Sequence, residues 1–124
     1  MAWDSDTSLT IEGSGAVAGT ELYTTTLVTH TPGEWSHVQV TANSGGTTDS
    51  LIIRSYGTLD ASSEVWDTVP LFQFTLDCTS GANCIVSFTV PKEIYKWRLG
   101  FVRTGSTDTI QTSANYRASG QNQS

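Results

Sequence analysis

The side chains best suited to acid–base chemistry in this sequence are two histidines, His30 and His37. A hydrolase needs a nucleophile beside a base and a third group that orients the base. Neither histidine belongs to a spacing known for such a site. His37 alternates with Val38, so we expect it to face outward beside Trp35 and Gln39, in a solvated or interface role. We expect a structural role for His30, and the sequence predicts no enzyme activity.

Residues that could bind a metal or a phosphate are equally sparse. Asp4-Ser5-Asp6 has the first acids of a calcium loop but lacks the Gly and the distal Glu that complete the coordination shell. Cys78 and Cys84 have no further Cys or His at zinc spacing. They are either ordinary half-buried thiols or, if their loop joins two antiparallel strands, a disulfide. Gly13-Ser14-Gly15 predicts a turn, because no helix with a Lys follows it. We therefore expect no metal and no cofactor.

Aromatic side chains that do not occupy the inward-facing positions of the predicted strands, or that lie beside turns, are better candidates for binding. Exposed aromatics anchor interfaces or stack on sugars. Ile52 and Tyr56 flank Arg54 on the outward phase of one predicted strand and form a second apolar patch, which suggests a contact with another subunit. The alternative is that irregular strand ends pack these aromatics into the core. The predicted partner-binding residues are Trp3, Trp35, Ile52, Arg54, Tyr56, Trp66 and Arg117.

The elements that must position these side chains are strands. Thr and Ser number 20 and 15 among 124 residues, whereas Lys occurs twice, and β-branched and hydroxyl side chains suit a pleated surface. Period-two alternation recurs between turn signals, and no ten-residue stretch keeps a helical period. We expect strands near 8–12, 20–30, 35–43, 50–58, 65–76 (broken around Pro70), 84–90, 95–103 and 108–117. About eight strands predict a single antiparallel β-sandwich domain over residues 1–124, jelly-roll-like, with an immunoglobulin-like sandwich as the alternative.

Alternation also predicts the core, since residues two apart share a face of the sheet. The expected inward residues are Ser36, Val38, Val40, Ala42, Leu51, Ile53, Phe72, Phe74, Leu76, Val86, Phe88, Val90, Trp97, Leu99, Phe101, Ile110, Ala114 and Tyr116. Each large apolar side chain contributes about 1.5–3 kcal/mol when fully buried. This core needs no cofactor.

The charge is uneven along the chain. Residues 1–91 carry ten acids and one base, whereas residues 92–124 carry five bases and two acids, for a total of −6. Opposite-sign regions favour self-association, and scarce Lys and Arg argue against nucleic-acid binding. The first residues have no signal-peptide pattern and no stretch has the length of a membrane span, so we expect cytosolic synthesis and no membrane partner. Residues 118–124 have no apolar side chain larger than Ala and are expected to form a polar arm, as is the N-terminus.

The compact all-β chain, its Thr/Ser/Gly-rich surface and the segment from Tyr95 to Ile110, expected to form a hairpin, resemble the small jelly-roll head decoration, or cement, proteins of tailed bacteriophages. The resemblance implies a non-enzymatic virion structural protein on the capsid surface. It would form a dimer or trimer, bind the major capsid protein and stabilise the head. The alternative is a carbohydrate-binding or receptor-binding β-sandwich module of a phage tail, since jelly rolls also carry aromatic platforms for sugars and the fold alone does not separate the two.

Overall fold

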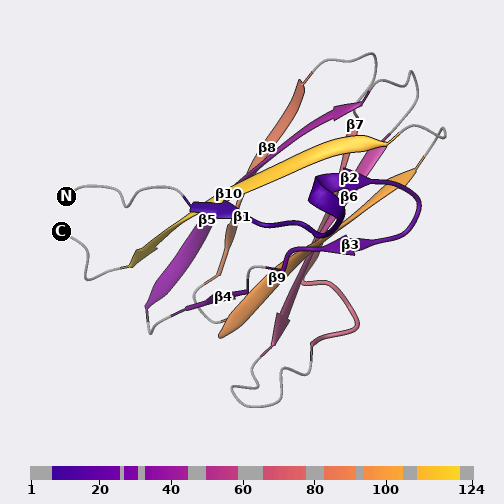
Figure 1. Cartoon of the computed structure of the whole chain (residues 1–124). Coiled ribbons are helices and arrows are strands. Elements are labelled where there is room, and N and C mark those ends of the chain that lie inside the picture. The colour runs from indigo at the N-terminus through magenta and orange to yellow at the C-terminus, as the bar shows by residue number, and fades with distance from the viewer. Residues whose placement is uncertain are drawn as a thin grey trace.

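A computed structural model describes residues 7–25, 27–30, 33–44, 50–58, 66–77, 83–91, 94–104 and 109–120, and these form two antiparallel sheets packed face to face (Figure 1). Sheet 1 has the order β1 (Thr7–Leu9), β10 (Ile110–Gly120), β5 (Glu34–Ser44) and β8 (Asn83–Val90), with β2 (Ala16–Val17) also paired to β10. Sheet 2 has the order β3 (Leu22–Tyr23), β9 (Lys96–Thr104), β6 (Ser50–Thr58) and β7 (Phe72–Asp77), with β4 (Val28–Thr29) also paired to β9.

The connectivity is that of a jelly roll. β1 and β2 lie along one side of β10, and β3 and β4 lie along one side of β9, so each pair acts as a single interrupted strand. Counted in this way, each sheet has four strands, as expected for an eight-stranded jelly roll. The described residues contain no α-helix, only a short 3-10 helix, η1 (Glu12–Gly15). The predicted all-β sandwich is therefore confirmed.

The core lies between the two sheets and consists of the side chains that alternation assigns to the inner faces. Trp97, Leu99 and Phe101 on β9 have no exposed surface, and neither do Leu51 and Ile53 on β6. At the open edges of the sandwich, three half-buried rings from β7 and β8 pack together with centroids 5.2 to 5.3 Å apart: Phe72, Phe74 and Phe88. The predicted strand phase is correct throughout this core.

Several predicted strands have different bounds. The strand expected at 20–30 is two short ones, because Thr24 interrupts it: its hydroxyl accepts a hydrogen bond from the Leu99 amide, and Thr24 forms a bridge with Ile11. The strand expected at 65–76 starts at Phe72. Among the described residues just before it, from 66 to 71, only the backbone amides of Asp67 and Leu71 donate hydrogen bonds to β6. Pro70 lacks the N–H that a continuous ladder would need.

The segment from Tyr95 to Ile110 is not a hairpin. β9 belongs to sheet 2 and β10 to sheet 1, so the two strands are not paired with each other. β7 likewise belongs to sheet 2 and β8 to sheet 1, so these two strands are not paired with each other, and a disulfide between Cys78 and Cys84 stays a prediction. Cys78 lies outside the described residues, and the thiol of Cys84 donates to the carbonyl oxygen of Asp77 at 3.0 Å.

The polar C-terminal arm is shorter than expected. Residues 118 to 120 continue β10 and pair with Ser36, Trp35 and Glu34 on β5, because backbone pairing does not depend on apolar side chains. Residues 121–124 and the N-terminal arm, 1–6, lie outside the described residues. Within the described part of the chain, no helix has the length and apolar character needed to cross a membrane.

Candidate functional site

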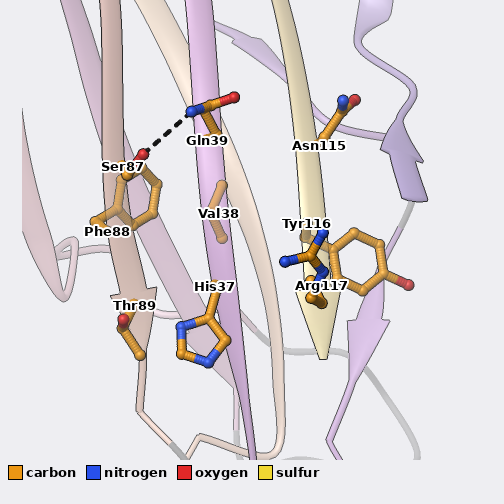
Figure 2. Close-up of a pocket in the computed structure, with 9 residues that line it drawn as sticks. All are labelled: His37, Val38, Gln39, Ser87, Phe88, Thr89, Asn115, Tyr116 and Arg117. Carbon is orange, nitrogen blue, oxygen red and sulfur yellow. Dashed lines mark hydrogen bonds between the residues drawn. The ribbon is translucent and has the colours of Figure 1, made fainter. Parts of the chain in front are cut away.

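The outer face of sheet 1 carries a grid of hydrogen-bonding side chains on three neighbouring strands. The register places Arg117, His37 and Thr89 side by side in one row, and Asn115, Gln39 and Ser87 in the next. Neighbouring strands lie about 4.8 Å apart, so each row spans roughly 10 Å. These six residues, which we call the grid, line an open hollow of about 500 Å³. Figure 2 shows their side chains.

The grid exists because strand alternation sends every second residue to the surface. The intervening residues Val38, Phe88 and Tyr116 also border the hollow, but their side chains belong to the core or pack against it. Gln39 and Ser87 are linked across β5 and β8 by a 3.5 Å contact between Nε2 and Oγ, the dashed line in Figure 2. Rigid strands thus present two amides, two hydroxyls, an imidazole and a guanidinium on one surface.

Trp35 lies next to the grid on the outward phase of β5. Its indole N–H donates to Nε2 of His37 at 2.8 Å, and the two rings meet edge to face with centroids 6.4 Å apart. Because indole N–H can only donate, Nε2 of His37 is the acceptor and the ring proton sits on Nδ1. The hydrogen bond fixes a half-buried aromatic ring beside the hollow. His37 faces outward beside Trp35 and Gln39, as predicted.

The predicted partner-binding residues lie on both outer faces. Trp35 and Arg117 lie on sheet 1, whereas Ile52, Arg54 and Tyr56 lie on β6 in sheet 2. Trp66, just before β7, contacts the same sheet 2 face through Arg98, whose guanidinium carbon is 4.7 Å from the indole centroid. Trp3 lies outside the described residues.

On the sheet 2 face, polar side chains bond mainly to one another. Tyr56 donates to Glu21 Oε2 at 2.9 Å, and Arg54 forms an ion pair with Glu21 Oε1 at 3.4 Å. Burial, and then the hydrogen bond to Glu21, raise the pKa of Tyr56, which keeps the phenol neutral. The guanidinium of Arg98 lies 4.2 Å from the ring centroid of Tyr23, on which it stacks. This network holds β3 against β9 and β6.

The expected exposed patch on β6 is therefore wrong for Tyr56, which is only 7% exposed. Glu21 covers it, and Tyr23 packs edge to face against it at 5.9 Å between centroids. Ile52 and Arg54 are half-buried. Among the described residues, the large apolar side chains that are exposed are Val69, Leu71 and Ile85.

A serine–histidine pair that sequence spacing did not indicate lies between the sheets. Nε2 of His30 is 2.7 Å from Oγ of Ser36, and Nδ1 is 2.9 Å from the carbonyl oxygen of Ile94. The indole N–H of Trp97 donates to the same Ser36 oxygen at 3.1 Å. Ser36 has no exposed surface and His30 is 5% exposed, so the pair is closed to a substrate in this conformation. Its bonds link β4, β5 and β9, the structural role expected for His30.

No cluster of three or more His, Cys, Asp or Glu residues in the described ranges could hold a metal ion. Of the six grid residues, only Arg117 was among the predicted partner-binding residues. The grid as a whole was missed because its members belong to strands far apart in the sequence, although the outward phase of His37 and Gln39 was predicted.

Comparison with known proteins assigns no family to this chain. No family model matches the chain, and no curated protein matches it. Among solved structures, one described as "CBM4 structure and function" aligns with a TM-score of 0.45 and 12% identity, over 81% of this chain and 61% of that chain. The chain thus spans about three fifths of the length of that protein.

Proposed function

We propose that this protein is a saccharide-binding module whose site is the grid on the outer face of sheet 1. The observation that carries the proposal is the side-by-side placement of Arg117, His37 and Thr89 above Asn115, Gln39 and Ser87. This is the carbohydrate-binding alternative raised by the sequence, now attached to a particular surface.

The chemistry of the grid suits a ligand rich in hydroxyl groups. A sugar hydroxyl both donates and accepts, and the amides of Gln39 and Asn115 offer both functions. Arg117 adds a planar donor fork, and Trp35 beside the grid adds an aromatic ring for the apolar face of a pyranose. A volume of about 500 Å³ lies within the range of small-ligand sites. An open hollow on the outer face of a sheet favours a segment of a polysaccharide chain over a small molecule that must be enclosed.

Titration of the protein against a panel of soluble polysaccharides and oligosaccharides tests the proposal. At least one member should bind, and Gln39→Ala and Asn115→Ala should each weaken binding about three- to tenfold, since each removes one hydrogen-bonding group. Gln73→Ala is the matched control, because Gln73 is an exposed amide on the outer face of sheet 2, bonded to Arg54. Failure of every saccharide to bind at millimolar concentration, or equal weakening by Gln73→Ala, contradicts the proposal.

Head decoration is the second candidate function. One observation favours it: the predicted partner-binding residues are divided between the two outer faces, and a protein that bridges capsid subunits needs two contact surfaces. The same variants separate the candidates. A decoration protein should attach to capsids lacking it, and substitutions on both faces should reduce attachment, whereas a saccharide module should be sensitive on the sheet 1 face alone.

A further inference from the structure

The four edges of the two sheets differ in how well they are protected against pairing with another chain. On one side of the sandwich, the edges consist of the short strands β1, β2, β3 and β4, each of two or three residues. On the other side, β7 is six residues long and ends in Asp77. Short strands and charged residues are two ways in which proteins discourage edge pairing.

β8 has neither protection. It is eight residues long, Asn83–Val90, and contains no charged residue and no proline. Within the described part of the chain it pairs only with β5, and its backbone from Ile85 to Val90 makes no other hydrogen bond there. In an antiparallel strand, every second residue turns both its N–H and its C=O away from the neighbour. β8 therefore presents a row of backbone donors and acceptors at the edge of sheet 1.

The side chains of β8 are self-complementary. In an antiparallel pairing of two β8 strands about a two-fold axis at Ser87, Ile85 lies opposite the second copy's Thr89 on the outer face, and Ser87 meets its own copy. On the inner face, Val86 lies opposite Phe88, and Cys84 opposite Val90. On the inner face apolar residues thus meet apolar residues, and on the outer face Ile85, which is 57% exposed, gains a contact with the Thr89 methyl group.

We infer that two copies of this chain pair through β8 and form a continuous sheet across a two-fold axis. β8 carries no charge, so two copies with a total charge of −6 each can approach along this edge without like charges on the paired strands facing each other. The pairing satisfies the edge groups of both strands and makes one isologous interface. It also places two grids on the same face of one eight-stranded sheet. The inference does not depend on the proposed function, because the β8 edge pairs whether or not the grid binds a saccharide.

Sedimentation velocity of the full chain between about 5 and 200 µM tests the inference, together with a charge swap that reads the register. The unmodified chain should dimerise, and Ile85→Lys should weaken the dimer at least about tenfold, because Lys on an edge strand opposes pairing. The double variant Ile85→Lys/Thr89→Glu should restore most of the lost affinity, since the register sets the two new charges opposite each other across the axis. Thr75→Lys, on the β7 edge, is the matched control and should leave the dimer unchanged.

Circular dichroism must first show that the variants are folded. Each outcome of the sedimentation experiment then supports or contradicts pairing through β8. A monomer at 200 µM overturns the inference and leaves β8 available to a strand of a different protein. A dimer that resists Ile85→Lys, or that Thr75→Lys weakens equally, uses another surface. A dimer that Ile85→Lys weakens but the double variant does not rescue pairs in a different register, which overturns the two-fold axis at Ser87.

Discussion

His30 shows how one buried side chain can tie the stability of the sandwich to pH. Its Nδ1 donates to the Ile94 carbonyl, so in the neutral ring Nε2 accepts from the Ser36 hydroxyl, while the oxygen of Ser36 accepts from Trp97. Burial lowers the pKa of His30 below its ordinary value of 6.5, against smaller opposing effects of the Ile94 carbonyl and Glu34. Protonation puts a second N–H at Nε2 and forces the Ser36 proton to find another acceptor.

The sign of the pH effect follows from the direction of that shift. Between the lowered folded pKa and the unfolded value of 6.5, the unfolded chain binds more protons than the folded chain. The contribution of His30 to the free energy of unfolding is therefore full above pH 6.5 and is lost as the pH falls below it. Urea unfolding at pH 7.5 and at pH 5 should show a decrease that His30→Gln reduces. His37→Gln is the control and should keep the decrease, and equal pH profiles for His30→Gln and the unmodified chain would contradict the assignment.

At the scale of elements, η1 packs closely against β10 because Gly15 has no side chain. Gly15 has φ of 79°, and a Cβ there would collide with the backbone carbonyl oxygen of Thr112. Gly13 also has a positive φ, 62°, but a Cβ would meet Leu22 Cδ1 at an ordinary 3.5 Å. Comparison of Gly13 with Gly15 therefore separates the cost of a left-handed backbone from the cost of a steric collision.

Gly13→Ala should therefore reduce the free energy of unfolding by about 1–2 kcal/mol, the cost of a left-handed backbone for a residue with a Cβ. Gly15→Ala adds displacement of β10 and should cost about 1–3 kcal/mol more. Chemical denaturation of both variants measures the difference. Equal losses would show that the contact between η1 and β10 can relax around the new methyl group.

At the scale of the whole molecule, a single core joins the two sheets. Buried side chains of sheet 1, such as Val38 and Val40, and of sheet 2, such as Leu51 and Phe101, belong to one cluster. Neither sheet can keep its inner face covered without the other, so we expect one cooperative unfolding transition. Tryptophan fluorescence and far-ultraviolet circular dichroism in urea should give coincident midpoints. Separate midpoints would mean that one sheet persists after the other has melted.

Much of this fold was predictable from the sequence because strand alternation is a local property. The inward phase of Val38, Val40 and Ala42, or of Trp97, Leu99 and Phe101, follows from residue spacing alone, and the structure buries all six. The sandwich class followed from the same pattern together with the turns between strands, whereas the described residues form ten strands instead of eight because the first strand of each sheet is interrupted. The partners proposed from the resemblance, a major capsid protein and a second copy of the chain, remain predictions.

Tertiary structure decided which strands are neighbours, and with that the candidate site. β5, β8 and β10 are far apart in the sequence, so no local pattern could place Gln39 between Ser87 and Asn115. The same limit explains Tyr56: its outward phase predicted exposure, but Glu21, 35 residues away in the chain, covers it. Residue spacing determines which face of a strand a side chain occupies, whereas what lies opposite or above that face depends on long-range pairing, which residue spacing does not encode.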